Sequence, residues 1–307
     1  MSPLAIPVAN LGSGLVLWWD PADPFHIYVQ GETRSGKSLF TYVYLSGLAQ
    51  LSPVVQVWGA DPTGILLDPW RDHPALEMRV ASLDDFDQVV DTFVRWEDEM
   101  KRRIRLLKEY RLDKLPTDPN NPYYEPIAVV VLEEWPGLVA AAESDDAASG
   151  RKKADAVNTT IKRIHGRLVR ESAKVNIRLF TLAQRMSSEA MATDDRMNYM
   201  CRASLKVDRL EDLRMVVPDA TTDMSSRAAK FPPGRMYIVD PRLPDRIEMA
   251  QGHFIDYRNY VAPDGQPRLG YVERVEAAAP KPVPYSQTNK IDPYYSGDDP
   301  TTETRMN

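Results

Sequence analysis

The chain of 307 residues is poor in the residue types that form disulfides, zinc sites and membrane spans. Cys201 is the only cysteine, which excludes an internal disulfide and fits a reducing cytoplasm. The four histidines, at 26, 73, 165 and 253, are too scattered for a zinc cluster. No apolar run approaches the ~20 residues of a membrane span, and residues 1–19 lack the pattern of a signal peptide. We therefore expect a cytoplasmic protein without a membrane span, which does not exclude a membrane-bound or capsid partner.

The chain as a whole also lacks excess positive charge, because its formal net charge is −6. The distribution is uneven, since ten Lys or Arg residues and only two acidic residues lie between Arg151 and Arg185. This stretch carries a net charge of +8, which leaves −14 for the rest of the chain. A concentrated basic stretch is typical of a nucleic-acid contact, but a solvated helix face has the same composition. Charge alone leaves DNA binding open.

A complete phosphate-binding loop of the pattern G-x-x-x-x-G-K-[ST] occupies residues 31–38. It follows an apolar run and precedes a helical pattern, which is the context that the motif requires. Backbone N–H groups of such a loop surround the β-phosphate, and the following helix adds positive potential. We expect Lys37 to reach the β- and γ-phosphate oxygens and the Ser38 hydroxyl to ligate Mg²⁺. The predicted nucleotide-binding residues are Gly31, Glu32, Thr33, Arg34, Ser35, Gly36, Lys37 and Ser38.

A second group of candidate catalytic residues follows the apolar run at 127–132. This run is typical of a strand buried on both faces of a parallel sheet, and it leads directly into Glu133 and Glu134. In ATPases with a phosphate loop, a carboxylate at this place lies beside Mg²⁺, and a following Glu polarises the attacking water. We predict Glu133 as a magnesium ligand, although Asp is the usual residue there, and Glu134 as the general base. The expected cofactors are ATP and Mg²⁺.

Strands and helices are predicted to alternate, which favours an α/β fold with a mainly parallel sheet flanked by helices. The strand at 15–19 is expected beside the strand that leads into the phosphate loop. Small acidic residues at 140–150 predict a mobile loop, and 236–239 with 247–254 predict a small antiparallel pair near the C-terminus. The remaining strands are predicted at 54–58, 127–132, 177–183 and 203–207, and the helices at 39–48, 84–111 and about 157–170.

We divide the chain into three parts on composition. Residues 1–13 are predicted to be an N-terminal arm, and residues 14–260 a single ATPase domain without a strong internal boundary. Prolines are frequent and apolar residues few toward the end, so 261–307 is predicted to be a disordered tail.

The order of these segments resembles the motor domain of FtsK/HerA-type DNA translocases. Residues 99–107 are similar to the family's Glu-Met-x-Arg-Arg-Tyr-x-Leu-Leu helix, and Asp61-Pro62 matches its Asp-Pro after the second strand. Residues 175–185 resemble its sensor strand, which ends in Ala-Thr-Gln-Arg, and 201–207 resemble the strand that follows. Residues 231–237 lie where the family has a Gly-x-Gly-x-Met-Leu-Tyr hairpin. The resemblance covers about residues 14–256 and implies a RecA-like fold.

The resemblance implies roles for further residues. Gln184 would contact the γ-phosphate or the attacking water, as a catalytic residue beside Lys37 and the two glutamates. Arg202 matches the arginine finger that the family inserts into a neighbouring subunit's site, with Arg163, Arg167 and Arg170 as competing candidates. Residues 140–153 lie where the family places a pore loop that faces DNA, which makes Arg151, Lys152 and Lys153 the candidates for DNA phosphate contacts.

The leading hypothesis is an ATP-driven translocase of double-stranded DNA that works as a homo-oligomeric ring, expected to be a hexamer, and grips phosphates without base specificity. The process it serves would be DNA transfer, packaging or segregation. One alternative is a protein-secretion ATPase, since type VII secretion motors share the domain. Those motors usually carry several ATPase modules and a membrane anchor, and neither occurs in these 307 residues. A second alternative is a scaffold that binds ATP but barely hydrolyses it, which the departure at Glu133 suggests.

Overall fold

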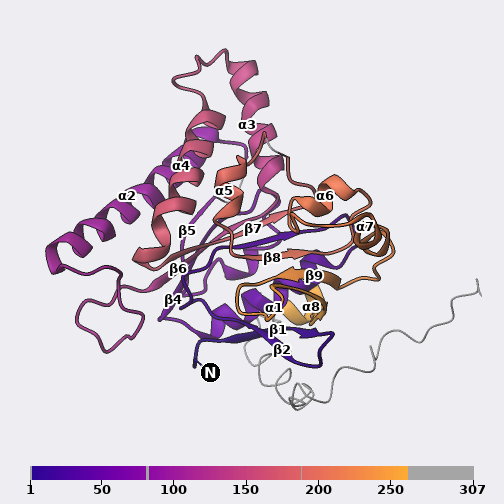
Figure 1. The fold of residues 1–307 in the computed structure, drawn as a ribbon. Helices are drawn as coiled ribbons and strands as arrows, with labels where there is room; N and C mark the ends of the chain where they lie inside the picture. Colours follow the sequence, from indigo (N-terminus) through magenta and orange to yellow (C-terminus); the bar gives the residue numbers. More distant parts are fainter. Residues whose placement is uncertain (1, 81–82, 188, 262–307) are drawn as a thin grey trace, which may run out of the picture.

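The computed structural model describes residues 2–80, 83–187 and 189–261, and a ten-stranded mixed sheet forms the centre of this part of the chain (Figure 1). The strand order is β2-β1-β10-β9-β8-β3-β7-β6-β4-β5. One side of the sheet is parallel and comprises β3 (Ile27–Gln30), β4 (Val55–Ala60), β5 (Leu76–Val80), β6 (Ile127–Leu132), β7 (Ile177–Ala183) and β8 (Cys201–Ser204). The other side is antiparallel and comprises β1 (Ile6–Leu11), β2 (Val16–Trp19), β9 (Arg235–Val239) and β10 (Ile247–Gly252).

The antiparallel side is larger than the sequence predicts. The expected pair of β9 and β10 is confirmed, but β1 and β2 extend it to the edge of the sheet. The strand predicted at 15–19 forms as β2, yet its placement beside β3 is wrong, because four strands separate the two. Residues 1–13, expected to be an arm, supply β1. The tail predicted at 261–307 lies outside the described residues except for Val261.

Helices cover both faces of the sheet, and each face has its own hydrophobic core (Figure 1). Successive residues of β6 alternate between the two cores, which is why this strand reads as a continuous apolar run. The long helices α2, α3 and α4 lie on one face, and α1 lies on the other (Figure 1). The helices are α1 (Lys37–Gln50), α2 (Phe86–Tyr110), α3 (Trp135–Ser149), α4 (Val157–Glu171), α5 (Thr193–Met197), α6 (Leu210–Arg214), α7 (Thr222–Ala228) and α8 (Tyr257–Tyr260).

Residues 140–150 form most of a helix, so the predicted mobile loop is wrong. They belong to α3, which ends at Gly150 in a left-handed conformation with φ of 62°. Alanine has the highest helix propensity, and a glycine just beyond the last turn is a common helix end. The small residues and the terminal glycine that suggested a loop are therefore the residues that form and terminate this helix.

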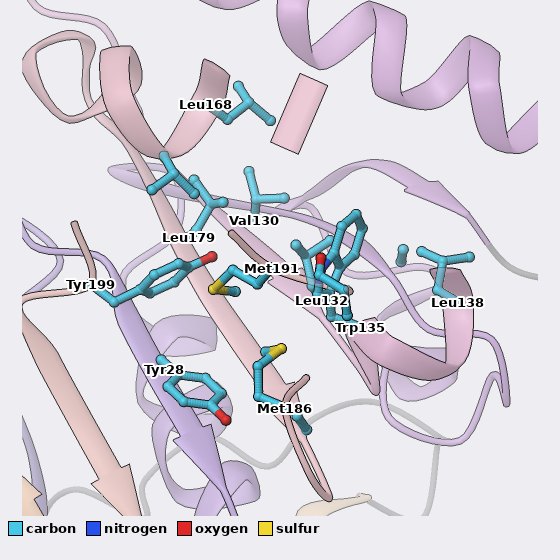
Figure 2. Close-up of a cluster of buried hydrophobic side chains, with 14 of the residues drawn as sticks. Tyr28, Val130, Leu132, Trp135, Leu138, Leu168, Leu179, Met186, Met191 and Tyr199 are labelled. Carbon is cyan, nitrogen blue, oxygen red and sulfur yellow. The ribbon is translucent and has the colours of Figure 1, made fainter. Parts of the chain in front are cut away.

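Trp135, the first residue of α3, joins the helical layer to the sheet (Figure 2). Its ring stacks on His165 of α4, with centroids 4.4 Å apart, and its Nε1 donates to the Ala190 carbonyl at 2.8 Å. The Nε2 atom of His165 lies 2.9 Å from the hydroxyl of Tyr199, which also contacts Thr181 of β7. These buried contacts fix the start of α3, and with it the residue before Trp135. Within the described residues, we find no helix with the length and apolar character needed to cross a bilayer.

Candidate active site

The candidate site lies at the carboxyl ends of four adjacent parallel strands, β3, β7, β6 and β4. The phosphate loop follows β3, Gln184 follows β7, Glu133 and Glu134 follow β6, and Asp61 follows β4. Ligand sites form at this edge in open α/β sheets, because the loops there converge. A cavity of about 440 Å³ opens between them, lined by Glu32, Thr33, Arg34, Gly36, Lys37, Ser38, Leu39, Thr63, Glu133, Glu134, Gln184 and Pro233.

The phosphate loop is fixed by a contact outside the motif. Gly36 caps the N-terminus of α1 with φ of 92°, a conformation that favours glycine. A Cβ atom at Gly36 would lie 2.7 Å from the backbone nitrogen of Gly234, which itself donates to the Ser35 carbonyl at 2.8 Å. The turn before β9 therefore supports the loop through backbone atoms.

The predicted general base, Glu134, already contacts the predicted phosphate-binding lysine. The Lys37 Nζ atom lies 3.0 Å from Glu134 Oε2, with the two side chains 14% and 30% exposed. Glu134 itself has φ of 48°, a left-handed conformation that is costly for a residue with a Cβ. It is held there because Trp135, the next residue, is anchored in the core. In this conformation Glu134 lines the cavity, and its carboxylate contacts Lys37.

Gln184 joins this cluster through both its backbone and its side chain. Its backbone N–H lies 3.1 and 3.0 Å from the two carboxylate oxygens of Glu134. Its side-chain oxygen accepts a hydrogen bond from the Thr33 hydroxyl of the phosphate loop at 3.3 Å. One carboxylate thus connects the phosphate-binding lysine to the end of β7, so the structure brings Lys37, Glu134 and Gln184 together.

Glu133 contacts a different set of groups. Its Oε2 atom accepts a hydrogen bond from Thr63 Oγ1 at 3.0 Å, and the same hydroxyl lies 3.0 Å from Asp61 Oδ1. Burial and the neighbouring Asp61 raise the pKa of Glu133 to about 8, against the opposing effects of the Thr63 hydrogen bond and the Lys37 charge. Such a carboxylate favours a nearby cation, which would offset both the burial and the acidic neighbour.

The oxygen donors fit Mg²⁺ held together with a nucleotide. Ser38 and Glu133 line the same cavity and offer a hydroxyl and a carboxylate, which are hard oxygen ligands. Residues 2–80, 83–187 and 189–261 contain no cluster of three or more His, Cys, Asp or Glu residues suited to a metal. Magnesium commonly uses one or two protein oxygens plus substrate phosphates, so a small donor set suits it. Bound there, the ion would neutralise charge on the phosphates.

Arg202, the predicted finger, does not line this cavity. It lies on β8, paired in register with Tyr28 of β3, and its Nε atom is buried without a hydrogen-bond partner among the described residues. Burial, together with nearby Arg196, lowers the pKa of Arg202 below its usual range. The competing arginines are already engaged, since Arg163 and Arg167 bind Glu97, and Arg170 binds Asp195.

Most of the basic stretch is neutralised by carboxylates of the same chain. Arg151, one candidate for DNA contact, lies against Asp145 and Asp146 and is 23% exposed. Lys152 and Lys153 are exposed and have no ion-pair partner within the described part of the chain. The other paired cations of the stretch are Lys162 with Glu143, Arg163 and Arg167 with Glu97, Arg170 with Asp195, and Arg185 with Asp212.

Two contacts of the site were not predicted from the sequence. Thr63 was not singled out, although the turn sequence Asp-Pro-Thr-Gly after β4 is a signal for a side chain fixed by its own loop. Glu32 was assigned to nucleotide binding, yet its Oε1 accepts the Asp208 backbone N–H at 2.9 Å. Glu32 therefore also ties the phosphate loop to the segment after β8.

Comparison with solved structures identifies the fold. The pCW3 conjugation coupling protein TcpA, in its monomer form with ATPgS, aligns with a TM-score of 0.69 at 17% identity over 90% of this chain and 72% of TcpA. The cytoplasmic domain of the type VII secretion ATPase EccC of Thermomonospora curvata aligns at 0.62 and 19% identity over 82% of this chain. ATPases 2 and 3 of EssC from Geobacillus thermodenitrificans align at 0.61 and 14% identity over 92% of this chain. The chain spans only 29% of the EccC structure and 51% of the EssC structure.

The sequence itself shows the family. A comparison with curated proteins found no match. The family model for FtsK/SpoIIIE matches residues 2–255, which include the phosphate loop, the strand that leads into Glu133 and Glu134, and β8 with Arg202. The resemblance to FtsK/HerA-type motors is thereby confirmed. Because the match covers most of the chain and the cavity has the parts of a nucleotide site, the chain belongs to the FtsK/SpoIIIE family of phosphate-loop ATPases.

Proposed function

We propose that this protein is an ATP-driven translocase of double-stranded DNA that acts as a homo-oligomeric ring. The observation that carries the proposal is the family match over 2–255, combined with a site in which Glu134 touches both Lys37 and Gln184. A nucleotide that draws Lys37 toward its phosphates would release one contact of Glu134. The loop after β7 would respond to that change, because the backbone of Gln184 connects it to Glu134.

Two adjacent exposed cations that form no ion pair within the described residues suggest where DNA phosphates are held. Lys152 and Lys153 are exposed just beyond α3, whereas Arg151 is engaged by Asp145 and Asp146. We assign the non-specific phosphate contacts to the two lysines and give Arg151 the role of anchoring the turn that presents them. A pure backbone contact carries no sequence information and depends strongly on salt.

The test is ATP hydrolysis measured with and without duplex DNA. We expect the wild type to be stimulated, and Lys152→Ala/Lys153→Ala to lose stimulation while keeping basal hydrolysis. The slope of log binding constant against log salt should flatten by about 1.8, because each lost phosphate contact removes about 0.9. The matched control is Lys114→Ala/Lys174→Ala, which removes two exposed lysines near the C-terminal end of α4, whereas Lys152 and Lys153 precede its N-terminal end. Equal slopes for the two double variants would exclude the lysines from DNA contact.

Arg202→Ala tests whether catalysis crosses a subunit interface. We expect ATP binding to persist and turnover to fall about 1000-fold, because the transferring phosphoryl group loses a permanent cation. Equal mixing with Lys37→Ala subunits should restore up to about a quarter of wild-type activity, since that fraction of head-to-tail interfaces joins an intact lysine to an intact arginine. Mixed rings that show no recovery would place the arginine's role within its own subunit.

A second candidate function is protein secretion, because the type VII secretion ATPases EccC and EssC share the fold. Basal hydrolysis that ignores DNA would favour it over the translocase. Saturable ATP binding without turnover would instead favour a nucleotide-dependent scaffold.

A further inference from the structure

We infer that Thr63 is a positioning residue that fixes the Glu133 carboxylate for the magnesium ion of the bound nucleotide. The inference rests on the proposed function only in requiring that the site binds ATP with Mg²⁺. It concerns a loop outside the phosphate-binding motif, and it accounts for a glutamate at a position where aspartate is usual.

Thr63 is held in place by a turn built around Asp61. Asp61 is only 1% exposed, and its carboxylate accepts backbone N–H groups from Gly64 at 3.0 Å and from Leu67 at 2.7 Å. Gly64 has φ of 72°, which closes the turn in a conformation that favours glycine. Both oxygens of Asp61 therefore hold the turn, and a side-chain hydrogen bond also joins this carboxyl group to Glu133.

The Thr63 hydroxyl connects this turn to Glu133. It lies 3.0 Å from Asp61 Oδ1 and 3.0 Å from Glu133 Oε2, and Thr63 is an exposed residue that lines the cavity. A β-branched side chain has few rotamers, so its hydroxyl is a rigid point of attachment. The contact fixes one oxygen of Glu133 and leaves Oε1 without a hydrogen bond to Thr63.

Glu133 needs such a support more than an aspartate would. A glutamate has one more rotatable bond, so ordering its side chain costs more conformational entropy. The hydrogen bond of Thr63 selects one orientation before the metal arrives. Outer groups that orient a ligand in this way commonly change metal affinity by 10- to 100-fold.

Thr63→Val removes the hydroxyl and keeps the branched shape, and Thr63→Ser keeps the hydroxyl. We expect Thr63→Val to raise the Mg²⁺ concentration that half-saturates binding of a non-hydrolysable ATP analogue about tenfold. Its affinity for the analogue in EDTA should not change, and Thr63→Ser should stay within about twofold of wild type. Equal Mg²⁺ requirements for the valine and serine variants would overturn the inference, provided that thermal melting shows both folded.

A double-mutant cycle sharpens the test. Glu133→Asp shortens the side chain by one methylene and moves the carboxylate away from Thr63, so Thr63→Val should add nothing in that background. A full second tenfold effect would show that Thr63 acts independently of Glu133. These readouts need neither hydrolysis nor DNA, so a loss of DNA stimulation would refute the translocase and leave this inference standing. Wild-type nucleotide binding that is indifferent to Mg²⁺ would refute the inference itself.

Discussion

Lys37→Ala abolishes ATP hydrolysis, with an expected loss of at least about 1000-fold, because the developing phosphate charge loses its fixed cation. The side chain is 14% exposed and enters the cavity from the first turn of α1. Its ammonium group has only Glu134 as an ion-pair partner in the described structure, so it is available to a nucleotide. Most of the affinity for ATP should be lost as well.

The measurement is phosphate release, with nucleotide affinity determined by calorimetry on the same samples. Lys37→Arg is a useful second variant, because it keeps the charge but replaces the compact ammonium group with a planar guanidinium group that fits the loop poorly. We expect it to remain inactive. Wild-type turnover in Lys37→Ala would remove the phosphate loop from the mechanism.

Glu134→Gln should keep ATP bound and stop its hydrolysis, with turnover reduced about 1000-fold, because an amide does not accept a proton from water. The structure adds a second expectation. Glu134 competes with the phosphates for Lys37 at 3.0 Å, so removal of its charge should tighten ATP binding by up to about fivefold. The amide oxygen still accepts the Gln184 backbone N–H, so the end of β7 should keep its place.

Glu133→Gln is the matched comparison for Glu134→Gln, because the two carboxylates are adjacent in sequence but contact different partners. It should raise the Mg²⁺ requirement without the tighter ATP binding. Rapid filtration with labelled ATP, followed by single-turnover measurement, separates binding from chemistry. A fully active Glu134→Gln beside an inactive Glu133→Gln would reverse the assignment of base and ligand.

Elements with strong local signals were predictable, and those defined by their neighbours were not. The buried run of β6 and the long amphipathic pattern of α2, whose N-cap Asp85 accepts the N–H groups of Asp87 and Gln88, formed as expected. The edge strand β5 was missed although its five residues, LEMRV, alternate apolar and polar side chains, because so short a run that pairs only with β4 gives a weak signal. The strand expected at 203–207 begins two residues earlier as β8, where pairing with β3 and β9 determines its bounds.

In the candidate site, too, the features with a local sequence signal were predictable and those defined by their neighbours were not. Lys37, Glu133, Glu134 and Gln184 each end a recognisable strand or belong to a motif, and parallel strands bring their carboxyl ends to one edge. The pairing of Arg163 and Arg167 with Glu97 could not be anticipated, because Glu97 lies on α2, far away in sequence. Asp145 and Asp146 are close to Arg151 in sequence, but they face it only because residues 140–149 are helical. The composition of a stretch of chain determines only the charges that the stretch itself carries. The local net charge also depends on the side chains that the fold places against that stretch.

The backbone contact between Gly36 and Gly234 has a consequence for how the loop recognises phosphate. A loop that is shaped by the protein before its ligand arrives loses little conformational freedom on binding, so more of the contact energy is retained as affinity. Gly234 lies far from the motif in sequence, yet a side chain at Gly36 would meet its backbone nitrogen at 2.7 Å. The turn before β9 is in this sense part of the phosphate-recognition element, and preorganisation of the loop depends on two distant glycines remaining side by side.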